Sequence, residues 1–197
     1  MSTSDSRARP PENPWELVHA LNAGRISDAG FYTACRTTPN AMPGFALDVL
    51  TRASEERDEE ALEFALYCGF KFALSPEPLP LLLHLAEADW HKRHEDIVSA
   101  LAEFKAPSSV DTLYRTALSK HDYLDYDEAF ALGVKCIWGL GSIDCAQAVT
   151  RLGYLLRCGN EVLEENAMNQ LKLMRDEATS EGTRAAASAR LARESTP

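Results

Sequence analysis

The chain has 197 residues, a formal net charge of −10, 45% hydrophobic residues and 25% charged residues. This composition is typical of a soluble globular protein, and no apolar run approaches the roughly 20 residues that a membrane-spanning helix needs. The negative charge argues against a nucleic-acid-binding protein, which needs a basic surface to displace the counterions of the phosphates. We therefore expect neither a membrane nor nucleic acid as a partner.

The first residues, MSTSDSRARPPENP, carry arginines with no apolar segment behind them, so they do not form a secretory signal. The chain has five cysteines, none of them in a Cys-x-x-Cys pair: Cys35, Cys68, Cys136, Cys145 and Cys158. Four of them lie in apolar helical patterns, where a free thiol acts as a small hydrophobe. We predict reduced cysteines and a cytoplasmic protein.

Residues 1–13 are polar and proline-bearing, which predicts a disordered leader. Residues 14–38 predict two short helices that form an N-terminal cap. Pro14 suits the first helical position, Gly24 suits a helix end, and Ser27 is a candidate N-cap for the second helix.

Helix pairs are expected to follow, joined by short polar links. Their second helices begin with an acidic residue and aliphatic residues: Asp96-Ile97-Val98, Glu128-Ala129-Phe130 and Glu161-Val162-Leu163. These steps recur roughly 32 to 36 residues apart, a spacing typical of helical repeats. Ser109 and Asn160 are candidate N-caps. Alternating β-branched runs are almost absent, so we expect no strands.

The predicted organisation is a single domain over residues 14–177, followed by a polar, Ala-rich tail over residues 178–197. The composition of this tail is too polar to bury a core.

Three stretches resemble a bacterial HEAT-repeat protein: ADWHKRHEDIVSALAEFKAPSSVDTLYRTAL, YLDYDEAFALGVKCIWGLGSID and AQAVTRLGYLLRCGNEVLEENAMNQL. The resemblance implies an all-α fold, a right-handed α-solenoid of about four helix pairs with a short N-terminal helical cap. The Val-Arg step that is familiar in HEAT repeats is replaced here by Ile-Val, Ala-Phe and Val-Leu. A Sel1-like or tetratricopeptide assignment is the main alternative, carried by Leu132-Gly133, Gly139-x-Gly141 and Asp144-x-x-x-Ala148.

Two polar clusters, residues 89–96 and 121–128, are the densest candidates for a site. Stacked repeats place equivalent residues side by side, so the two clusters are expected to merge into one acidic, aromatic surface. The predicted partner-binding residues are Trp90, His94, Glu95, Asp96, Asp122, Tyr123, Asp125, Tyr126, Asp127 and Glu128. The alternative is that the acidic residues only stabilise the helix dipole.

The same two clusters could also be read as metal-binding sites. Glu87, His91 and His94 would share one face of a continuous helix, as metal ligands do, but Lys92 and Arg93 add positive charge there. The acids of residues 121–128 lack EF-hand spacing. Di-iron hydroxylases of HEAT type use several His-Glu dipeptides, and this chain has one, His94-Glu95.

The chain also has no nucleophile elbow, phosphate-binding loop or dinucleotide fingerprint. We therefore predict no metal, no cofactor and no enzymatic activity. The tryptophan Trp138 is expected in the core, because large aromatic residues at helical spacing usually pack.

The expected function is protein binding. The resemblance implies an immunity protein that neutralises a cognate bacterial toxin, in which the acidic surface occludes a basic active surface. The alternatives are a HEAT-repeat scaffold or regulatory adaptor, and a HEAT-like metal-dependent enzyme.

Overall fold

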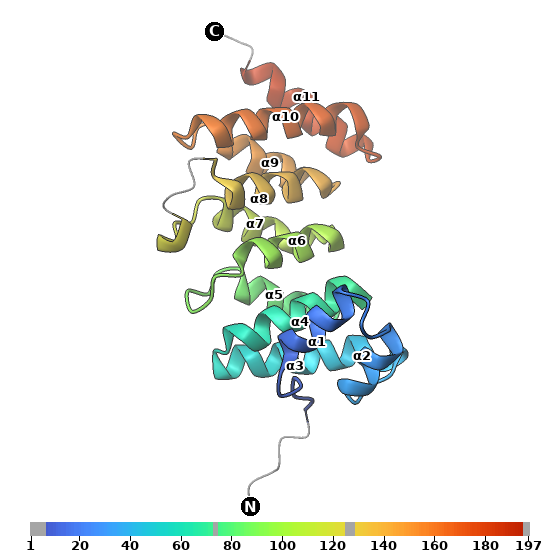
Figure 1. The fold of residues 1–197 in the computed structure, drawn as a ribbon. Coiled ribbons are helices and arrows are strands. Elements are labelled where there is room, and N and C mark those ends of the chain that lie inside the picture. Colours follow the sequence, from blue (N-terminus) through green and yellow to red (C-terminus); the bar gives the residue numbers. More distant parts are fainter. Residues whose placement is uncertain (1–6, 73–74, 125–128, 195–197) are drawn as a thin grey trace, which may run out of the picture. The chain divides into compact units, whose positions relative to one another are not determined.

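The computed structural model describes residues 7–72, 75–124 and 129–194. Within these ranges the chain forms α-helices, short 3-10 helices and no strand, which confirms the all-α prediction. The α-helices are α1 (Pro14–Asn22), α2 (Asp28–Ala34), α3 (Met42–Glu56), α4 (Glu59–Phe72), α5 (Leu79–Leu85), α6 (His94–Phe104), α7 (Val110–Ala117), α8 (Ala131–Ser142), α9 (Ala146–Leu155), α10 (Glu161–Glu177) and α11 (Glu181–Glu194) (Figure 1). The 3-10 helices are η1 (Pro39–Ala41), η2 (Pro107–Ser109) and η3 (Asp122–Leu124). None of the described helices combines the length and the apolar character that a bilayer crossing requires.

The chain divides into two compact units. Unit 1 comprises Met1–Leu81 and Trp90–Arg93, and unit 2 comprises Leu82–Asp89 and His94–Pro197. The sequence predicts one domain over residues 14–177, whereas the contacts within the chain gather in these two units.

Unit 1 is organised around the aromatic side chain of Phe31 in α2, which is fully buried. The centroid of its ring lies 5.0 Å from that of Phe72 and 6.1 Å from that of Phe64, both in α4. The predicted cap signals are confirmed, because α1 begins at Pro14 and the Ser27 hydroxyl accepts a hydrogen bond from the N–H of Gly30.

In unit 2, alternate helices pack side by side. Helices α6, α8 and α10 form one layer, and α7, α9 and α11 form the other. Consecutive helices from α7 to α11 also contact one another and so join the two layers. Figure 1 shows these helices following one another through the green, yellow and red part of the chain.

Helix α8 approaches its neighbours closely because glycines occupy its contact positions. A Cβ placed on Gly133 would lie 2.7 Å from Leu163 Cδ2 of α10 and 3.0 Å from the main-chain oxygen of Ala117. A Cβ on Gly139 would lie 3.2 Å from Leu113 Cδ1 of α7. The absence of side chains at these two positions therefore sets how near α7 and α10 lie to α8.

The start of α8 differs from the prediction. The sequence places Ala129 and Phe130 at its beginning, whereas the helix begins at Ala131. Phe130 adopts a left-handed conformation, with φ of 52°, which cannot be part of a right-handed helix. Ser109 holds the N-cap position of α7, as predicted, but its side chain makes no capping hydrogen bond. The cap predicted at Asn160 is confirmed by a 3.1 Å hydrogen bond from the N–H of Leu163.

Part of the predicted tail is a packed helix. Helix α11 buries Thr183, Ala187 and Leu191, which recur every fourth residue and so share one face. It contacts α9 and α10, and Arg190 donates a hydrogen bond to the main-chain oxygen of Gly153 in α9. These three buried residues are enough to pack α11 against its neighbours, although most of the helix is polar.

The part of the predicted leader that the structure describes, residues 7–13, is held in place. The main chain of Arg7 and Ala8 is hydrogen-bonded to side chains of α3, so the segment lies on unit 1.

The five cysteines are free thiols, and Cys35, Cys68 and Cys136 are buried. Burial raises the pKa of the Cys35 thiol to about 11, and it also raises the pKa of Cys136. These thiols are therefore protonated near neutral pH and act as small apolar side chains, as the sequence predicts.

We predict different effects on stability for two glycine substitutions in α8. Gly133→Ala should lower the free energy of unfolding by about 2 kcal/mol, because the new methyl group meets the main-chain oxygen of Ala117, which cannot move away without shifting α7. The atoms nearest to a Cβ at Gly141 belong to the flexible side chain of Gln170, which can rotate away, so the stability of Gly141→Ala should stay within about 1 kcal/mol of wild type. Urea unfolding followed by circular dichroism measures both. Equal stability of the two variants would contradict the packing described here.

Candidate functional site

The predicted partner-binding residues do not all lie together. Glu95 and Asp96 lie in the first turn of α6, as expected, and both are half-buried. Trp90 belongs to unit 1, where it is half-buried and its ring meets that of His91 edge-on, 4.8 Å between centroids. The members Asp125, Tyr126, Asp127 and Glu128 lie outside the described residues.

His94 is an interior residue and does not contribute to a surface. Its side chain is fully buried at the start of α6. The Nε2 atom lies 2.7 Å from the main-chain oxygen of Ala88, and Nδ1 lies 2.9 Å from the hydroxyl of Tyr123. Because Ala88 O can only accept, Nε2 carries the proton and a neutral ring accepts from Tyr123 at Nδ1. The partner-binding role predicted for His94 is therefore corrected to a structural one.

His94 is part of a cluster with His121 and Tyr123, on the connection after α7. The rings of His94 and His121 lie 3.8 Å apart between centroids, and Ser119 Oγ lies 2.9 Å from His121 Nε2. Burial lowers the pKa of His121. The cluster ties this connection to the start of α6 and leaves Asp122 exposed at the surface.

The metal site weighed from the sequence is not formed. Helix α5 ends at Leu85 and α6 begins at His94, so Glu87, His91 and His94 do not share the face of one helix. Both ring nitrogens of His94 have protein partners, and Glu87 accepts hydrogen bonds from Arg115. Across the described ranges, no three His, Cys, Asp or Glu side chains are placed to hold a metal ion.

The acidic start of α6 is partly neutralised by α8. Lys135 Nζ lies 2.7 Å from Glu95 Oε2. An ion pair at this degree of exposure contributes at most about 1 kcal/mol to stability, but it reduces the negative charge that Glu95 offers to a partner. The sequence does not reveal this pair, because the two residues are 40 positions apart and on different helices.

The same outward face of α8 carries an exposed tryptophan. The side chain of Trp138 is 56% exposed, and its Nε1–H donates a 3.2 Å hydrogen bond to Asn166 Oδ1 of α10. The buried side of α8 is taken by Leu132, Cys136, Ile137 and Leu140. Trp138 lies three residues after Lys135, on the same side of the helix and away from that buried side. The prediction that it belongs to the core is therefore wrong.

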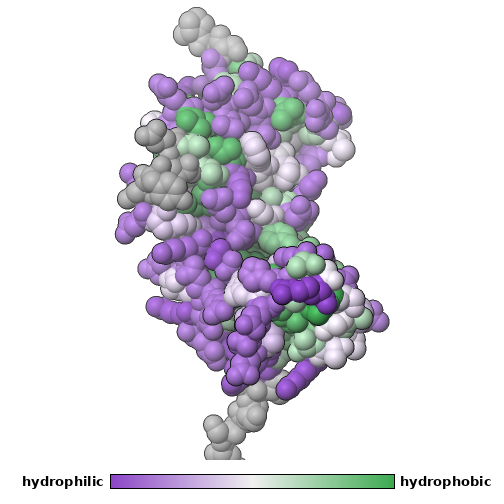
Figure 2. Space-filling view, in the orientation of Figure 1, coloured by the Kyte–Doolittle hydropathy of each residue, from purple (hydrophilic) through white to green (hydrophobic). Residues whose placement is uncertain are grey.

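Trp138 borders a cavity of about 480 Å³ between α8 and α10. Its lining includes Lys105, Ser142, Gln170, Leu173, Met174 and Glu177. Leu173 is 45% exposed, so two large apolar side chains stand beside a cavity whose remaining lining is mixed in polarity. On the face drawn in Figure 2, hydrophilic residues cover most of the surface and hydrophobic residues gather in separate clusters. We call Trp138, Leu173 and the residues of this cavity the α8–α10 surface.

Asp144 fixes one end of the cavity. Its carboxylate accepts hydrogen bonds from the Thr179 hydroxyl and from the Ser180 N–H, at 2.5 and 2.8 Å. The hydroxyl groups of Thr179 and Thr183 and the Ser180 N–H lower the pKa of Asp144 to about 2. Asp144 thereby joins the connection after α8 to the connection before α11.

No family model matches the chain, and neither the curated proteins nor the solved structures contain a significant match to it. The fold and the surface therefore define its class directly: an all-α protein of packed helices with an exposed tryptophan beside a cavity.

The low pKa of Asp144 predicts a pH-dependent contribution to stability. Because the folded-state pKa is below the unfolded value, the contribution is present above about pH 4 and is lost as the pH falls toward about 2. Asp144→Asn should be less stable than wild type near neutral pH, and this difference should shrink over that acidic range. Urea midpoints between about pH 6 and pH 2.5 measure it, with Glu165→Gln, an exposed carboxylate of α10, as the control. A difference that stays constant with pH would contradict the assignment.

Proposed function

We propose that the chain is a non-enzymatic protein-binding module whose partner is a basic protein. The observation that carries this proposal is the α8–α10 surface, where Trp138 and Leu173 are exposed beside a cavity. Tryptophan is enriched among the residues that contribute most to protein–protein binding, particularly beside a pocket. The net charge of −10 favours a basic partner, since complementary fields speed encounter.

The specific form that we propose is an immunity protein, which neutralises a cognate toxin by occluding its active surface. This form follows from the HEAT-like stretches of the sequence. We also propose that the helices of unit 2 continue the helix-pair arrangement of an α-solenoid; the contacts between alternate helices in both layers support this. The five free thiols support the proposed cytoplasmic location.

A scaffold or adaptor would use the same surface for a different partner. The two functions differ in gene neighbourhood, because an immunity protein is encoded directly beside its toxin. The partner to test first is therefore the product of the adjacent open reading frame.

Trp138→Ala should weaken binding of this partner about 30-fold, which corresponds to about 2 kcal/mol and is typical of the loss of a central tryptophan. Tyr154→Ala is the matched control, because Tyr154 is 52% exposed but lies on α9, in the other layer. Isothermal titration of the purified proteins measures both. Equal affinities for the two variants would exclude the α8–α10 surface as the interface.

A separate prediction concerns the acidic surface expected from the sequence. Reversing two of its charges, as Asp96→Lys with Asp127→Lys, should slow association with a basic partner about tenfold at low salt. It should also abolish the rescue of growth when both genes are co-expressed. Rescue that survives the double reversal would show that these carboxylates do not contact the partner.

A further inference from the structure

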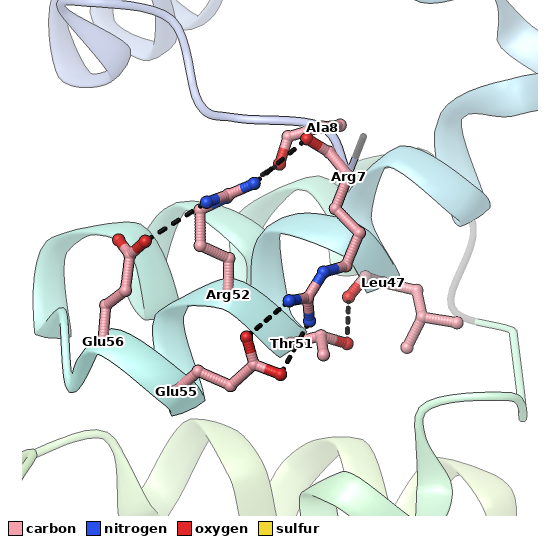
Figure 3. Close-up of polar contacts among 7 residues, drawn as sticks. All are labelled: Arg7, Ala8, Leu47, Thr51, Arg52, Glu55 and Glu56. Carbon is pink, nitrogen blue, oxygen red and sulfur yellow. Dashed lines mark hydrogen bonds and ion pairs between the residues drawn. The ribbon is translucent and has the colours of Figure 1, made fainter. Parts of the chain in front are cut away.

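Unit 1 binds a short stretch of its own main chain in a way that points to a peptide-binding site. One face of α3 carries Asp48, Arg52 and Glu55, at positions i, i+4 and i+7. These side chains contact Arg7 and Ala8 of the non-helical segment that precedes α1. Figure 3 shows the contacts of Arg52 and Glu55.

The contacts with Ala8 are made entirely to main-chain atoms. Arg52 Nε donates to the carbonyl oxygen of Ala8, and Arg52 Nη2 donates to that of Arg7, at 3.4 and 3.2 Å. The N–H of Ala8 donates to Asp48 Oδ2 at 3.1 Å. The main-chain N–H and C=O of Ala8 are thus both hydrogen-bonded to α3. Any non-proline residue in the same place could make these two bonds.

Arg52 is only 5% exposed, although it is charged. It also donates to Glu56 Oε1, at 3.2 Å. A buried guanidinium needs hydrogen-bond acceptors, and here the main-chain carbonyl oxygens of Arg7 and Ala8 are two of them. Arg52 is therefore built to hold a peptide main chain.

One side chain of the segment is recognised as well. The guanidinium of Arg7 donates to both carboxylate oxygens of Glu55, at 2.8 and 2.6 Å. This two-bond arrangement matches arginine better than lysine, because the planar fork presents two parallel N–H groups. Figure 3 shows the Arg7 side chain extending from the segment toward Glu55 of α3, beside Arg52.

The segment does not fill the space beside it. A cavity of about 920 Å³ lies between residues 8–12 and the end of α2 with the start of α3. Gly44 borders this cavity, and a Cβ placed there would meet no atom within 4 Å. A peptide with larger side chains than Ala8 therefore has room in the same position.

We propose that Asp48, Arg52 and Glu55 form a binding site for an extended, arginine-containing segment of another protein, and that Arg7 and Ala8 are its intramolecular occupant. The site reads one arginine through Glu55 and the following residue through its main chain. It lies in unit 1 and extends beyond the function proposed for the α8–α10 surface. A test of this site therefore does not depend on Trp138.

The test uses a fluorescein-labelled peptide with the sequence of residues 4–12, titrated into the full chain and followed by fluorescence anisotropy. Wild type should bind it weakly, because a tethered occupant competes at an effective concentration on the order of millimolar. The variant Arg7→Ala with Ala8→Pro removes the contacts to Glu55 and Asp48 from the tethered segment. It should bind the peptide about tenfold more tightly.

Matched controls separate recognition from simple charge attraction. A peptide with Ala in place of Arg7 should lose binding, whereas one with Ala in place of Arg9 loses the same charge and should keep it. In the variant chain, Glu55→Gln should remove the gain in affinity, whereas Glu60→Gln, an exposed residue of α4, should not. Equal binding by wild type and variant, or equal loss with both peptides, would overturn the proposal.

Hydrogen exchange on the unmutated chain gives a second measurement that does not depend on any variant folding. Saturating peptide should displace the tethered segment, so the amide of Ala8 should exchange faster. Unchanged exchange would also overturn the proposal. So would a concentration-dependent dimer of wild type in size-exclusion chromatography, because the occupant would then be a second copy of the chain.

Discussion

The close approach of α8 to its neighbours is the constraint on which unit 2 depends. Gly133 and Gly139 leave no space for a side chain between α8 and the helices beside it. Packed interiors tolerate little change in volume, so the buried face of α8 can take one orientation only. The outward positions of Lys135 and Trp138 follow from that orientation, and the chemistry of the surface is thus fixed by residues that never reach it.

Polar contacts between alternate helices align the helices within each layer. In one layer, Arg115 of α7 binds Glu87, Arg151 of α9 binds Asp111 of α7, and Arg190 of α11 binds the main chain of α9. In the other layer, Lys135 and Trp138 of α8 contact α6 and α10. Such exposed contacts contribute little to stability. A shift of one helical turn, about 5.4 Å, would break several at once, so they define the alignment more than the stability.

The sequence predicts what local chemistry decides. The cap at Asn160 and the all-α fold are examples, because a capping side chain and helical periodicity act within a few residues. The left-handed turn at Phe130 is not predictable in this way, since an aromatic residue rarely adopts it. The burial of His94 depends on Tyr123, 29 residues later, and no pattern within α6 reveals it. Trp138 was misplaced for a different reason: its size favours burial, but the four apolar residues of α8 already occupy the inner side.

The burial of Arg52 constrains how the segment on α3 can leave. If the segment left α3, the Arg52 guanidinium would lose the carbonyl oxygens of Arg7 and Ala8 as acceptors, and this loss opposes its departure. A competing peptide could occupy the proposed site only after the segment had left. Exchange of this kind makes the departure of the resident segment the slow step, so the rate at which a competitor is captured would level off as its concentration rises.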